Sequence, residues 1–315
     1  MLEIALNVFL TLVGLAMLCF GGNWLVTGGA GIAKKLRISQ LVIGLTVVAY
    51  GTSTPELAAG IAAAESHADL LLGNVVGSNI ANIGLVIAVS AIMIPLMLKK
   101  TFTLRREILI MIVVAFFLVL ISLDGELSRI DGMILLGGLS AFTYFVYKKA
   151  KKERDSAGSN QTKIEGQKSF SYHIALLIIG IVLLYFGAIF TVDNAVIVAE
   201  SFGVSERVIG ITIIAIGTSL PELVTSVIAI RKGHKDIGFG NIIGSNIYNI
   251  LMILGITSVM TGIAVNPSIF TDYWIMIGFS FGLILLMRFT ALSKKEGIAL
   301  ATAFFVYLGT LFFLI

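Results

Sequence analysis

The stretch VVAYGTSTPELAAG, residues 47–60, is apolar at both ends and carries a proline and a carboxylic acid at its centre. The chain has 315 residues, of which 57% are hydrophobic and only 13% are charged, and its mean hydropathy is +1.01. A soluble domain of this size carries more charge than that on its surface. We therefore expect residues 47–60 to lie inside a membrane, where the carboxylate of Glu56 is costly to bury.

Apolar stretches of about 20 residues, the length that crosses the hydrocarbon core of a bilayer, recur along the chain. We expect ten membrane-spanning helices, near residues 5–26, 40–64, 70–98, 106–123, 130–147, 172–193, 206–230, 236–262, 272–289 and 297–315. Twenty of the 22 Lys and Arg residues then fall on one side, leaving Arg129 and Arg207 on the other. The positive-inside rule predicts a multi-pass plasma-membrane protein with that side in the cytoplasm and both termini extracellular. The net charge of +4 is a topology signal and gives no reason to expect nucleic-acid binding.

Two motifs occur twice. VIGLTVVAYGTSTPELA (42–58) matches VIGITIIAIGTSLPELV (208–224), and GNVVGSNIANI (73–83) matches GNIIGSNIYNI (240–250). Each copy holds five expected spans, and an odd number makes the second copy enter the membrane from the opposite side. The sequence thus predicts an all-α fold of two inverted five-helix repeats, 1–147 and 172–315, joined by a polar cytoplasmic linker, 148–171.

Glu222 repeats Glu56, and of the 18 acidic residues these two are the only ones expected deep inside spans. A carboxylate at the bilayer centre costs about 2.5–3.5 kcal/mol on insertion scales. Helix packing gives no reason to bury two of them in the same motif. We therefore interpret both glutamates as functional residues.

Each of these acids follows a proline, Pro55 or Pro221. Proline lacks a backbone N–H and clashes with the preceding turn, so the second and seventh spans should be broken there. We expect this break to free main-chain carbonyls near Ala49 and Ala215. Carbonyls, hydroxyls and carboxylates are the hard oxygen donors that Na⁺ and Ca²⁺ prefer.

The third and eighth spans carry the second motif. Ser78 and Asn82, like Ser245 and Asn249, are four residues apart and share one helical face. Loosened backbone at membrane depth is tolerated where it lines a cavity or is buried in protein, and inverted repeats bring such segments together near the midplane. The pattern predicts broken helices 2, 3, 7 and 8 around a midplane cation site. Taken alone, the glycines of this motif are also typical of close helix packing.

Together, GTSTPE with GNVVGSNIAN and GTSLPE with GNIIGSNIYN resemble the two α-repeats of the sodium/calcium exchanger family, within the cation/Ca²⁺ exchanger superfamily. The resemblance covers essentially the whole chain. It implies antiport of Ca²⁺ against Na⁺ by alternating access, with the first helix of each repeat sliding as a gate. Carried over by position, Glu56 and Glu222 would bind Ca²⁺ and share it with Na⁺. The implied ion-binding set is Glu56, Glu222, Asn82, Asn249, Thr52, Ser53, Thr218, Ser219, Ser78, Ser245 and the carbonyls of Ala49 and Ala215.

Three departures accompany the resemblance. Asn249 stands where some members of the superfamily have an acid, so two carboxylates remain to balance one Ca²⁺ or two Na⁺. Thr54 and Tyr248 differ from their counterparts in the other copy, and the sequence does not predict their effect.

Other functions stay open at this point. A H⁺/Ca²⁺ exchanger, or one for another divalent cation, could use the same glutamates if burial favours their protonation, although the hydroxyl-rich flanks favour Na⁺. A passive cation channel fits an in-plane inverted repeat less well. An intramembrane enzyme is disfavoured, because no zinc-ligand spacing, no Ser/Lys or Ser/His pairing and no aspartate dyad is present in the sequence. We expect no cofactor and no required protein partner beyond the lipid bilayer and the transported ions.

Overall fold

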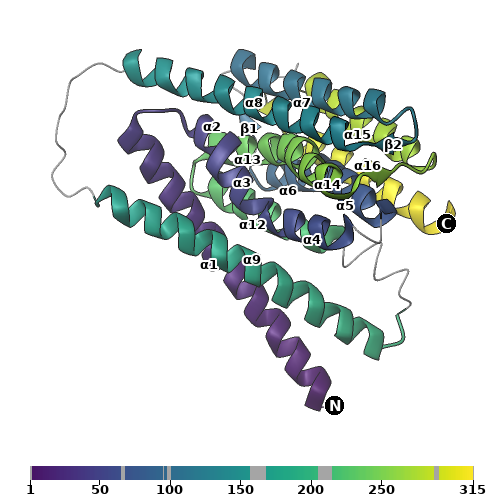
Figure 1. Cartoon of the computed structure of the whole chain (residues 1–315). Helices are drawn as coiled ribbons and strands as arrows, with labels where there is room; N and C mark the ends of the chain where they lie inside the picture. Colours follow the sequence, from purple (N-terminus) through teal and green to yellow (C-terminus); the bar gives the residue numbers. More distant parts are fainter. Residues whose placement is uncertain are drawn as a thin grey trace.

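The fold is all-helical (Figure 1). The computed structural model describes residues 2–64, 68–94, 96–97, 101–156, 168–204, 215–286 and 291–314. Within these ranges six helices are long and apolar enough to cross a membrane, or seven if the bent pair Gln40–Thr52 and Thr54–Ala64 is one span. Residues 206–214 of the seventh expected span lie outside the described residues. The chain is therefore built as a polytopic helical membrane protein.

The two halves of the chain run through their elements in a similar order. The first half contains α1 (Leu2–Leu36), α2 (Gln40–Ile43), the π-helix η1 (Gly44–Val48), α3 (Ala49–Thr52), α4 (Thr54–Ala64), α5 (Ala68–Ala81), the π-helix η2 (Asn82–Ile87), α6 (Ala88–Met93), β1 (Leu96–Met97), α7 (Thr101–Ile121), β2 (Glu126–Leu127) and α8 (Arg129–Ser156). The second half contains α9 (Phe170–Ser201), α11 (Ala215–Thr218), α12 (Leu220–Arg231), α13 (Lys235–Tyr248), the π-helix η4 (Asn249–Leu254), α14 (Gly255–Thr261), β3 (Ile263–Ala264), α15 (Ile269–Leu286), β4 (Ala291–Leu292) and α16 (Lys294–Leu314). Helix α8 continues well past residue 147, so the start of the expected linker is helical.

The breaks fall at the predicted motifs. The segment Gln40–Thr52 is bent by 45° against Thr54–Ala64, and Pro55 stands at the start of the second piece. In the second half α11 ends at Thr218, and Pro221 lies in the first turn of α12. At the other two predicted breaks the helix is not interrupted. Helices α5 and α13 pass directly into π-helices at Asn82 and Asn249. Such π-turns are frequent at functional sites.

The short strands join the halves reciprocally. Strand β1, which follows α6, pairs antiparallel with β4, which lies between α15 and α16. Strand β3, which follows α14, pairs antiparallel with β2, which lies between α7 and α8. The strand that follows the central helix of each half therefore pairs with the strand between the last two helices of the other half.

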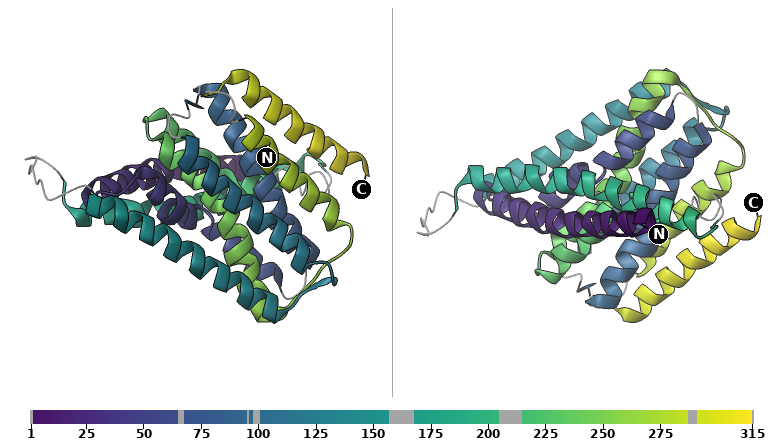
Figure 2. Two further views of the ribbon diagram at one scale, coloured as in Figure 1. Left: turned by 90° about the horizontal axis from the view of Figure 1, so that it is seen from above. Right: turned by 90° about the horizontal axis from the view of Figure 1, so that it is seen from below.

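The most buried spans lie at the centre of the molecule. Of the apolar window of Ala68–Met93, 78% is buried, and 89% of that of Lys235–Thr261, against 22% for α1 and 33% for α9. Helices α1 and α9 lie side by side at the periphery, as the right view of Figure 2 shows. The second-motif residues thus lie on the two helices most shielded from lipid.

A seam of glycines lets α1 and α9 pack with their backbones close together. A Cβ on Gly14, Gly21 or Gly28, which are spaced seven residues apart, would come within 2.5–2.9 Å of atoms of α9. Gly180 and Gly187 make the reciprocal approach to α1, at 2.7 and 2.9 Å. Small residues at such an interface allow close helix association in a membrane.

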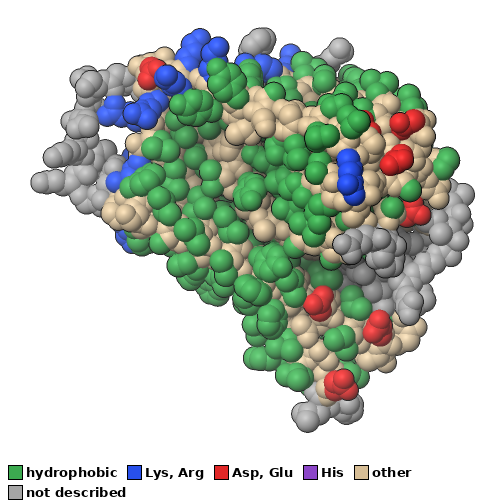
Figure 3. All heavy atoms as spheres, in the orientation of Figure 1, with side chains coloured by type: hydrophobic (Ala, Val, Ile, Leu, Met, Phe, Trp, Pro, Cys, Tyr) green, Lys and Arg blue, Asp and Glu red, His purple; other side chains and the backbone are tan. Residues whose placement is uncertain are grey.

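Charge divides the surface along the long axis of the helices (Figure 3). Lys and Arg side chains gather where α8 ends and α9 begins, and Asp and Glu gather at the opposite end, near the N-terminus of α1 and the turn between α7 and α8. Hydrophobic side chains cover the face between them. This banding is what a helical membrane protein presents to a bilayer and its two aqueous sides.

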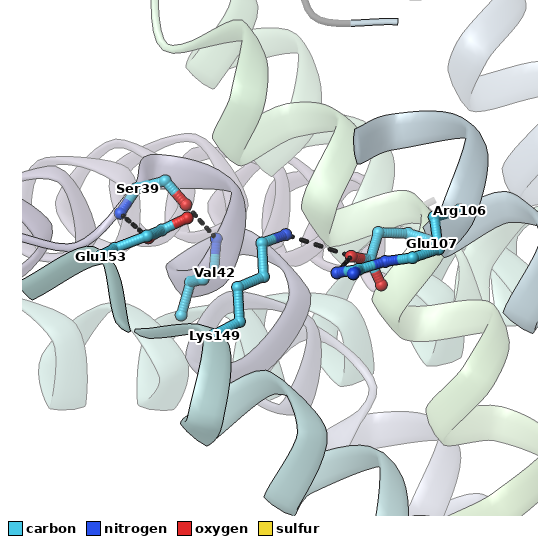
Figure 4. Close-up of polar contacts among 6 residues, drawn as sticks. All are labelled: Ser39, Val42, Arg106, Glu107, Lys149 and Glu153. Carbon is cyan, nitrogen blue, oxygen red and sulfur yellow. Dashed lines mark hydrogen bonds and ion pairs between the residues drawn. The ribbon is translucent and has the colours of Figure 1, made fainter. Parts of the chain in front are cut away.

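At the basic end of the molecule, a third buried carboxylate was missed by the sequence reasoning. Glu107 of α7 is fully buried, and its Oε1 lies 3.1 Å from Arg106 Nη2 and 3.1 Å from Lys149 Nζ of α8. One helical turn beyond Lys149, Glu153 Oε2 accepts a 2.8 Å hydrogen bond from the backbone N–H of Ser39, the residue that caps α2 (Figure 4). Helix α8 therefore ties α7 to the start of the broken span.

The glycine seam predicts that Gly21→Ala destabilises the protein. The new Cβ would lie 2.9 Å from Gly180 O and from Leu184 N, which are backbone atoms that cannot turn aside. Overpacking of this kind costs about 1–3 kcal/mol, so the midpoint of thermal unfolding in detergent should fall. Gly137→Ala is the matched control, because no described atom lies within 4 Å of its Cβ position. Equal midpoints for the two variants would contradict the close approach.

The ion pairs of the buried Glu107 predict that Lys149→Met also destabilises the fold. We expect a loss of about 1–3 kcal/mol, less than the full cost of an unpaired buried charge, because Arg106 still contacts Glu107. The added change Glu107→Gln should restore most of the lost stability, since no buried charge then needs a partner. Lys151→Met, at an exposed position of the same helix, is the control. Additive losses in the double variant would show that the pair is not coupled.

Candidate functional site

The site lies where the two broken spans meet the two central helices. The first motif supplies residues around the ends of α3 and α11 and the first turns of α4 and α12. The second motif supplies residues at the junctions of α5 with η2 and of α13 with η4. The predicted side chains that are buried here are Thr52, Ser53, Glu56, Ser78, Asn82, Ser219, Glu222, Ser245 and Asn249, and Thr218 is half-buried.

Local sequence explains why the acids sit at helix starts. Proline is favoured in the first turn of a helix, where its missing N–H costs nothing, and each glutamate follows its proline directly. Glu56 and Glu222 therefore lie in the first turns of α4 and α12. The N-terminal end of a helix dipole favours negative charge at these positions.

The expectation of a freed carbonyl at Ala49 was wrong for this structure. Its oxygen accepts a 3.0 Å bond from the backbone N–H of Ser53 and a 3.2 Å bond from the hydroxyl of Thr52. The physical reason is register: the N–H missing at Pro55 belongs to a bond with the carbonyl four residues back, that of Gly51. Ala215 begins α11, and its side chain lies outside the described residues.

The two carboxylates lie close enough to interact with each other and differ in their surroundings. Oε1 of Glu222 accepts bonds from the hydroxyls of Ser53, at 3.3 Å, and Ser245, at 3.2 Å. Both oxygens of Glu56 are buried and have no partner within the described parts of the chain. The site is therefore asymmetric, with one acid held by hydroxyls from both halves and the other left bare.

Hydroxyls and amides surround the acids. Thr52 Oγ1 donates to Asn241 Oδ1 at 2.9 Å and lies 3.3 Å from Ser245 Oγ. In the corresponding contact, Ser78 Oγ of the first half lies 3.4 Å from Thr218 Oγ1 of the second half. The structure thus gathers hydroxyls from both copies of the first motif with those of the second.

The unsatisfied oxygens are the chemically informative feature. Among the described residues, buried oxygens without a hydrogen-bond partner include Glu56 Oε1, Glu56 Oε2, Glu222 Oε2, Asn82 Oδ1 and Asn249 Oδ1. All five are acceptors, and leaving buried acceptors unpaired is costly, most of all when they carry charge. A hard cation would satisfy them together, since carboxylate and amide oxygens are the ligands that Ca²⁺ and Na⁺ prefer.

The residue types exclude a second kind of metal chemistry in the described ranges. No group of three or more His, Cys, Asp or Glu side chains that could hold a metal ion occurs there. Nitrogen and thiolate ligands are what zinc and copper sites are built from. The predicted ligands here are oxygen donors, two of which are carboxyl groups.

Sequence reasoning missed four participants. Asn79 and Asn246 belong to the second motif but were not among the predicted ligands, and they bond across the centre to each other's helices. Met111 and Met276 were not predicted to take part, and their sulfurs accept bonds from Asn246 and Asn79. The repetition of SNxxN in both halves was the only signal for the asparagines.

Packing was the correct interpretation of the glycines in the second half. A Cβ on Gly240 would lie 2.8 Å from Leu41 O, and one on Gly244 would lie 2.6 Å from Ala49 Cβ. These glycines bring α13 against the span that carries the first motif. Of the two asymmetric positions, Thr54 bonds the Tyr50 carbonyl of its own helix, and the ring of Tyr248 packs edge-on against that of Tyr50.

The chain is similar to known proteins over nearly its whole length. The family model described as sodium/calcium exchanger protein matches residues 6–148 and 172–313. The chain is 34% identical over 355 residues to the sodium/calcium exchanger MaX1 of Methanosarcina acetivorans, covering 99% of this chain and 100% of that one. It is 37% identical over 310 residues to the putative antiporter CaxA of Alkalimonas amylolytica, covering 96% and 97%. A solved structure of the sodium-calcium exchanger NCX_Mj, soaked with 10 mM Na⁺ and zero Ca²⁺, superposes with a TM-score of 0.84 at 32% identity, covering 98% of this chain and 99% of that one.

The unpaired carboxylate of Glu56 predicts that this residue lowers the stability of the ion-free protein and is needed for cation binding. In ion-free buffer Glu56→Gln should unfold at the same temperature as wild type or higher, because it removes repulsion between two buried carboxylates. Added Ca²⁺ should raise the unfolding midpoint of the wild type, since a ligand that binds the native state stabilises it, and should leave that of the variant unchanged. Glu200→Gln, at an exposed position, is the control. A variant that keeps the Ca²⁺-dependent rise would remove Glu56 from the site.

Proposed function

The chain belongs to the sodium/calcium exchanger family, and from that premise we propose that it is a secondary antiporter that exchanges Na⁺ for Ca²⁺ by alternating access. Its cargo is inorganic ions, and its work is transport rather than catalysis. The observation that carries the proposal is a set of five buried acceptor oxygens that have no hydrogen-bond partner among the described residues. Three of the five belong to the two glutamates, and two belong to Asn82 and Asn249.

The charge of the site accounts for competition between the two ions. Two carboxylates balance one Ca²⁺ or two Na⁺, so the ions bind to overlapping oxygens and exclude each other. In this proposal Ca²⁺ is held by Glu56 and Glu222 with the amide oxygens of Asn82 and Asn249. Na⁺ shares the acids and takes hydroxyl or backbone oxygens from the remaining set, Thr52, Ser53, Ser78, Thr218, Ser219 and Ser245.

The proposal includes ten spans in two inverted five-helix repeats, 1–147 and 172–315. Three observations support it. The central elements α5 with η2 and α13 with η4 correspond one to one, the strand pairs β1–β4 and β2–β3 are reciprocal, and the contacts of Asn79 with Asn246 are made in both directions. An inverted pair of repeats provides two equivalent packings of the same parts, which is the basis of alternating access.

The moving part in this proposal is the pair α1 and α9. Their glycine seam packs the two helices backbone to backbone, so that they would move as one unit. Helix α9 also contacts both copies of the first motif: Ile181 lies against Gly51 and Val192 against Gly217. A shift of α1 and α9 along their axes would therefore change the packing of α9 against both copies of the first motif. The charge banding of Figure 3 supports a plasma-membrane orientation with extracellular termini and a cytoplasmic linker, 148–171.

Calcium-45 uptake into proteoliposomes tests the function. Vesicles loaded with Na⁺ should accumulate Ca²⁺, whereas vesicles loaded with K⁺ or choline should not, and a proton uncoupler should leave the uptake unchanged. Glu56→Gln and Glu222→Gln should each abolish it, because the charge that balances Ca²⁺ is halved. Glu200→Gln, reconstituted alongside, should transport like wild type.

Other outcomes would redirect the assignment. Uptake that ignores internal Na⁺ and follows a pH gradient would make the protein a proton-coupled exchanger. Flux that needs neither gradient would contradict antiport and indicate a channel.

A further inference from the structure

Two asparagines outside the predicted ion-binding set, Asn79 and Asn246, contact two residues that belong to it. Asn79 and Asn246 lie one turn before Asn82 and Asn249 on α5 and α13. Both are buried, with exposed fractions of 1%. Each bonds to the ion-site asparagine of the opposite half: Asn79 Oδ1 accepts from Asn249 Nδ2 at 3.0 Å, and Asn246 Oδ1 accepts from Asn82 Nδ2 at 2.9 Å.

The orientation of these two amides is fixed by groups that can only accept. Asn79 Nδ2 donates to the backbone carbonyl of Asn246 at 3.2 Å and to the sulfur of Met276 at 3.5 Å. Asn246 Nδ2 donates to the backbone carbonyl of Asn79 at 3.3 Å and to the sulfur of Met111 at 3.4 Å. A carbonyl and a thioether have no proton to give. Reversing either amide would therefore set oxygen against two acceptors.

The fixed amides in turn fix the outer pair. Because the Oδ1 atom of Asn79 faces Asn249, the atom of Asn249 that meets it must be the donor, Nδ2. The carbonyl Oδ1 of Asn249 then points the other way, where it is buried and meets no partner among the described groups. The same chain of reasoning, run through Asn246, leaves Oδ1 of Asn82 free in the same manner.

We propose that Asn79 and Asn246 are positioning residues that force the amide oxygens, rather than the amide nitrogens, of Asn249 and Asn82 toward the transported cation. This inference rests on the proposed function of the site. An asparagine free to rotate presents its NH₂ group as readily as its oxygen, and an NH₂ group repels a cation. With the amides held, each outer asparagine offers an oxygen before any ion arrives, which is preorganisation of the site.

The arrangement also explains how two neutral residues can serve beside two acids. A carboxylate has two oxygens and can bind a cation in either orientation. An amide has one oxygen and one NH₂ group, so its orientation decides whether it can bind a cation. The crossing of the bonds matters too, since α5 orients a ligand on η4 and α13 orients one on η2. Each half of the molecule thus completes the coordination of the other.

Double-variant cycles on Ca²⁺ binding test the inference. Asn79→Leu removes the acceptor and should weaken equilibrium binding of calcium-45 in detergent about tenfold or more. In an Asn249→Asp background the same change should weaken it no more than about twofold, because a carboxylate offers oxygen whichever way it turns and no longer faces the oxygen of Asn79. Asn82→Asp should give no such rescue of Asn79→Leu. The mirror cycle, Asn246→Leu with Asn82→Asp, should behave alike.

The pairing pattern separates positioning from packing. Asn194→Leu is the matched control, because Asn194 is buried in a peripheral helix and bonds only a carbonyl of its own helix, at 2.7 Å from Phe190 O; its Ca²⁺ binding should match wild type. Unchanged binding in both Asn79→Leu and Asn246→Leu would overturn the proposal. So would losses that either aspartate rescues equally, or that neither rescues, because a packing role has no preferred partner.

Two further provisions keep the result decisive. If Asn79→Leu does not give a monodisperse protein, Asn79→Ala and the mirror cycle at Asn246 carry the test with a smaller volume change. Equilibrium binding is measured without any ion gradient, so failure of the antiport assay in wild type would sink the proposed function while these cycles still report whether the amides are positioned.

Discussion

Two carboxylates share one buried site with too few hydrogen-bond donors, and the rest of the molecule depends on this constraint. Glu222 receives two hydroxyls and Glu56 none within the described ranges. Such a pair is costly to bury unless a cation joins it. In the proposed function, the helix breaks that put both acids at helix starts, the shielded central spans and the hydroxyl and amide oxygens near the acids hold that cation within protein.

The contrast with Glu107 makes the point sharper. That acid is just as buried, yet the protein supplies its own cations, Arg106 and Lys149, each at 3.1 Å. Its charge is balanced permanently, and its work is to hold α7 against α8. The central acids lack any such cationic partner among the described residues. In the proposed function, the transported cation takes that place. Glu107, whose cations belong to the chain, therefore has a structural role. Glu56 and Glu222, which have no such cations among the described residues, are the acids that we propose for transport.

The neutral asparagines of the site are also defined by which hydrogen-bond partners they have and which they lack. The asparagines of the second motif form a closed network in which two backbone carbonyls and two methionine sulfurs take every available amide proton of the inner pair. Glycines of the same motif pack α13 against the first broken span, to within contact of its backbone atoms at Gly240 and Gly244. The glycines of the second copy of the motif thus pack closely, whereas a Cβ on Gly73 or Gly77 of the first copy would meet no described atom within 4 Å. The ion-binding role of the polar residues in the motif stays a prediction.

The sequence alone determined the membrane class, the duplicated motifs, the two central glutamates and the side chains that gather around them, because hydropathy, proline chemistry and the cost of a buried charge act locally. It did not determine which oxygens are left free. The Ala49 carbonyl, expected to be open, is bonded within its own turn, and Asn79, Asn246 and Glu107 were not recognised. Only the tertiary structure decided the contacts of the two asparagines and of Glu107, since each depends on how a helix is set against another more than 40 residues away in the chain, as Glu107 is from Lys149. The Ala49 carbonyl is instead bonded locally, by residues three and four positions further along. Hydrogen-bond partners form over about 3 Å, and no local pattern specifies the relative position of distant helices to that precision.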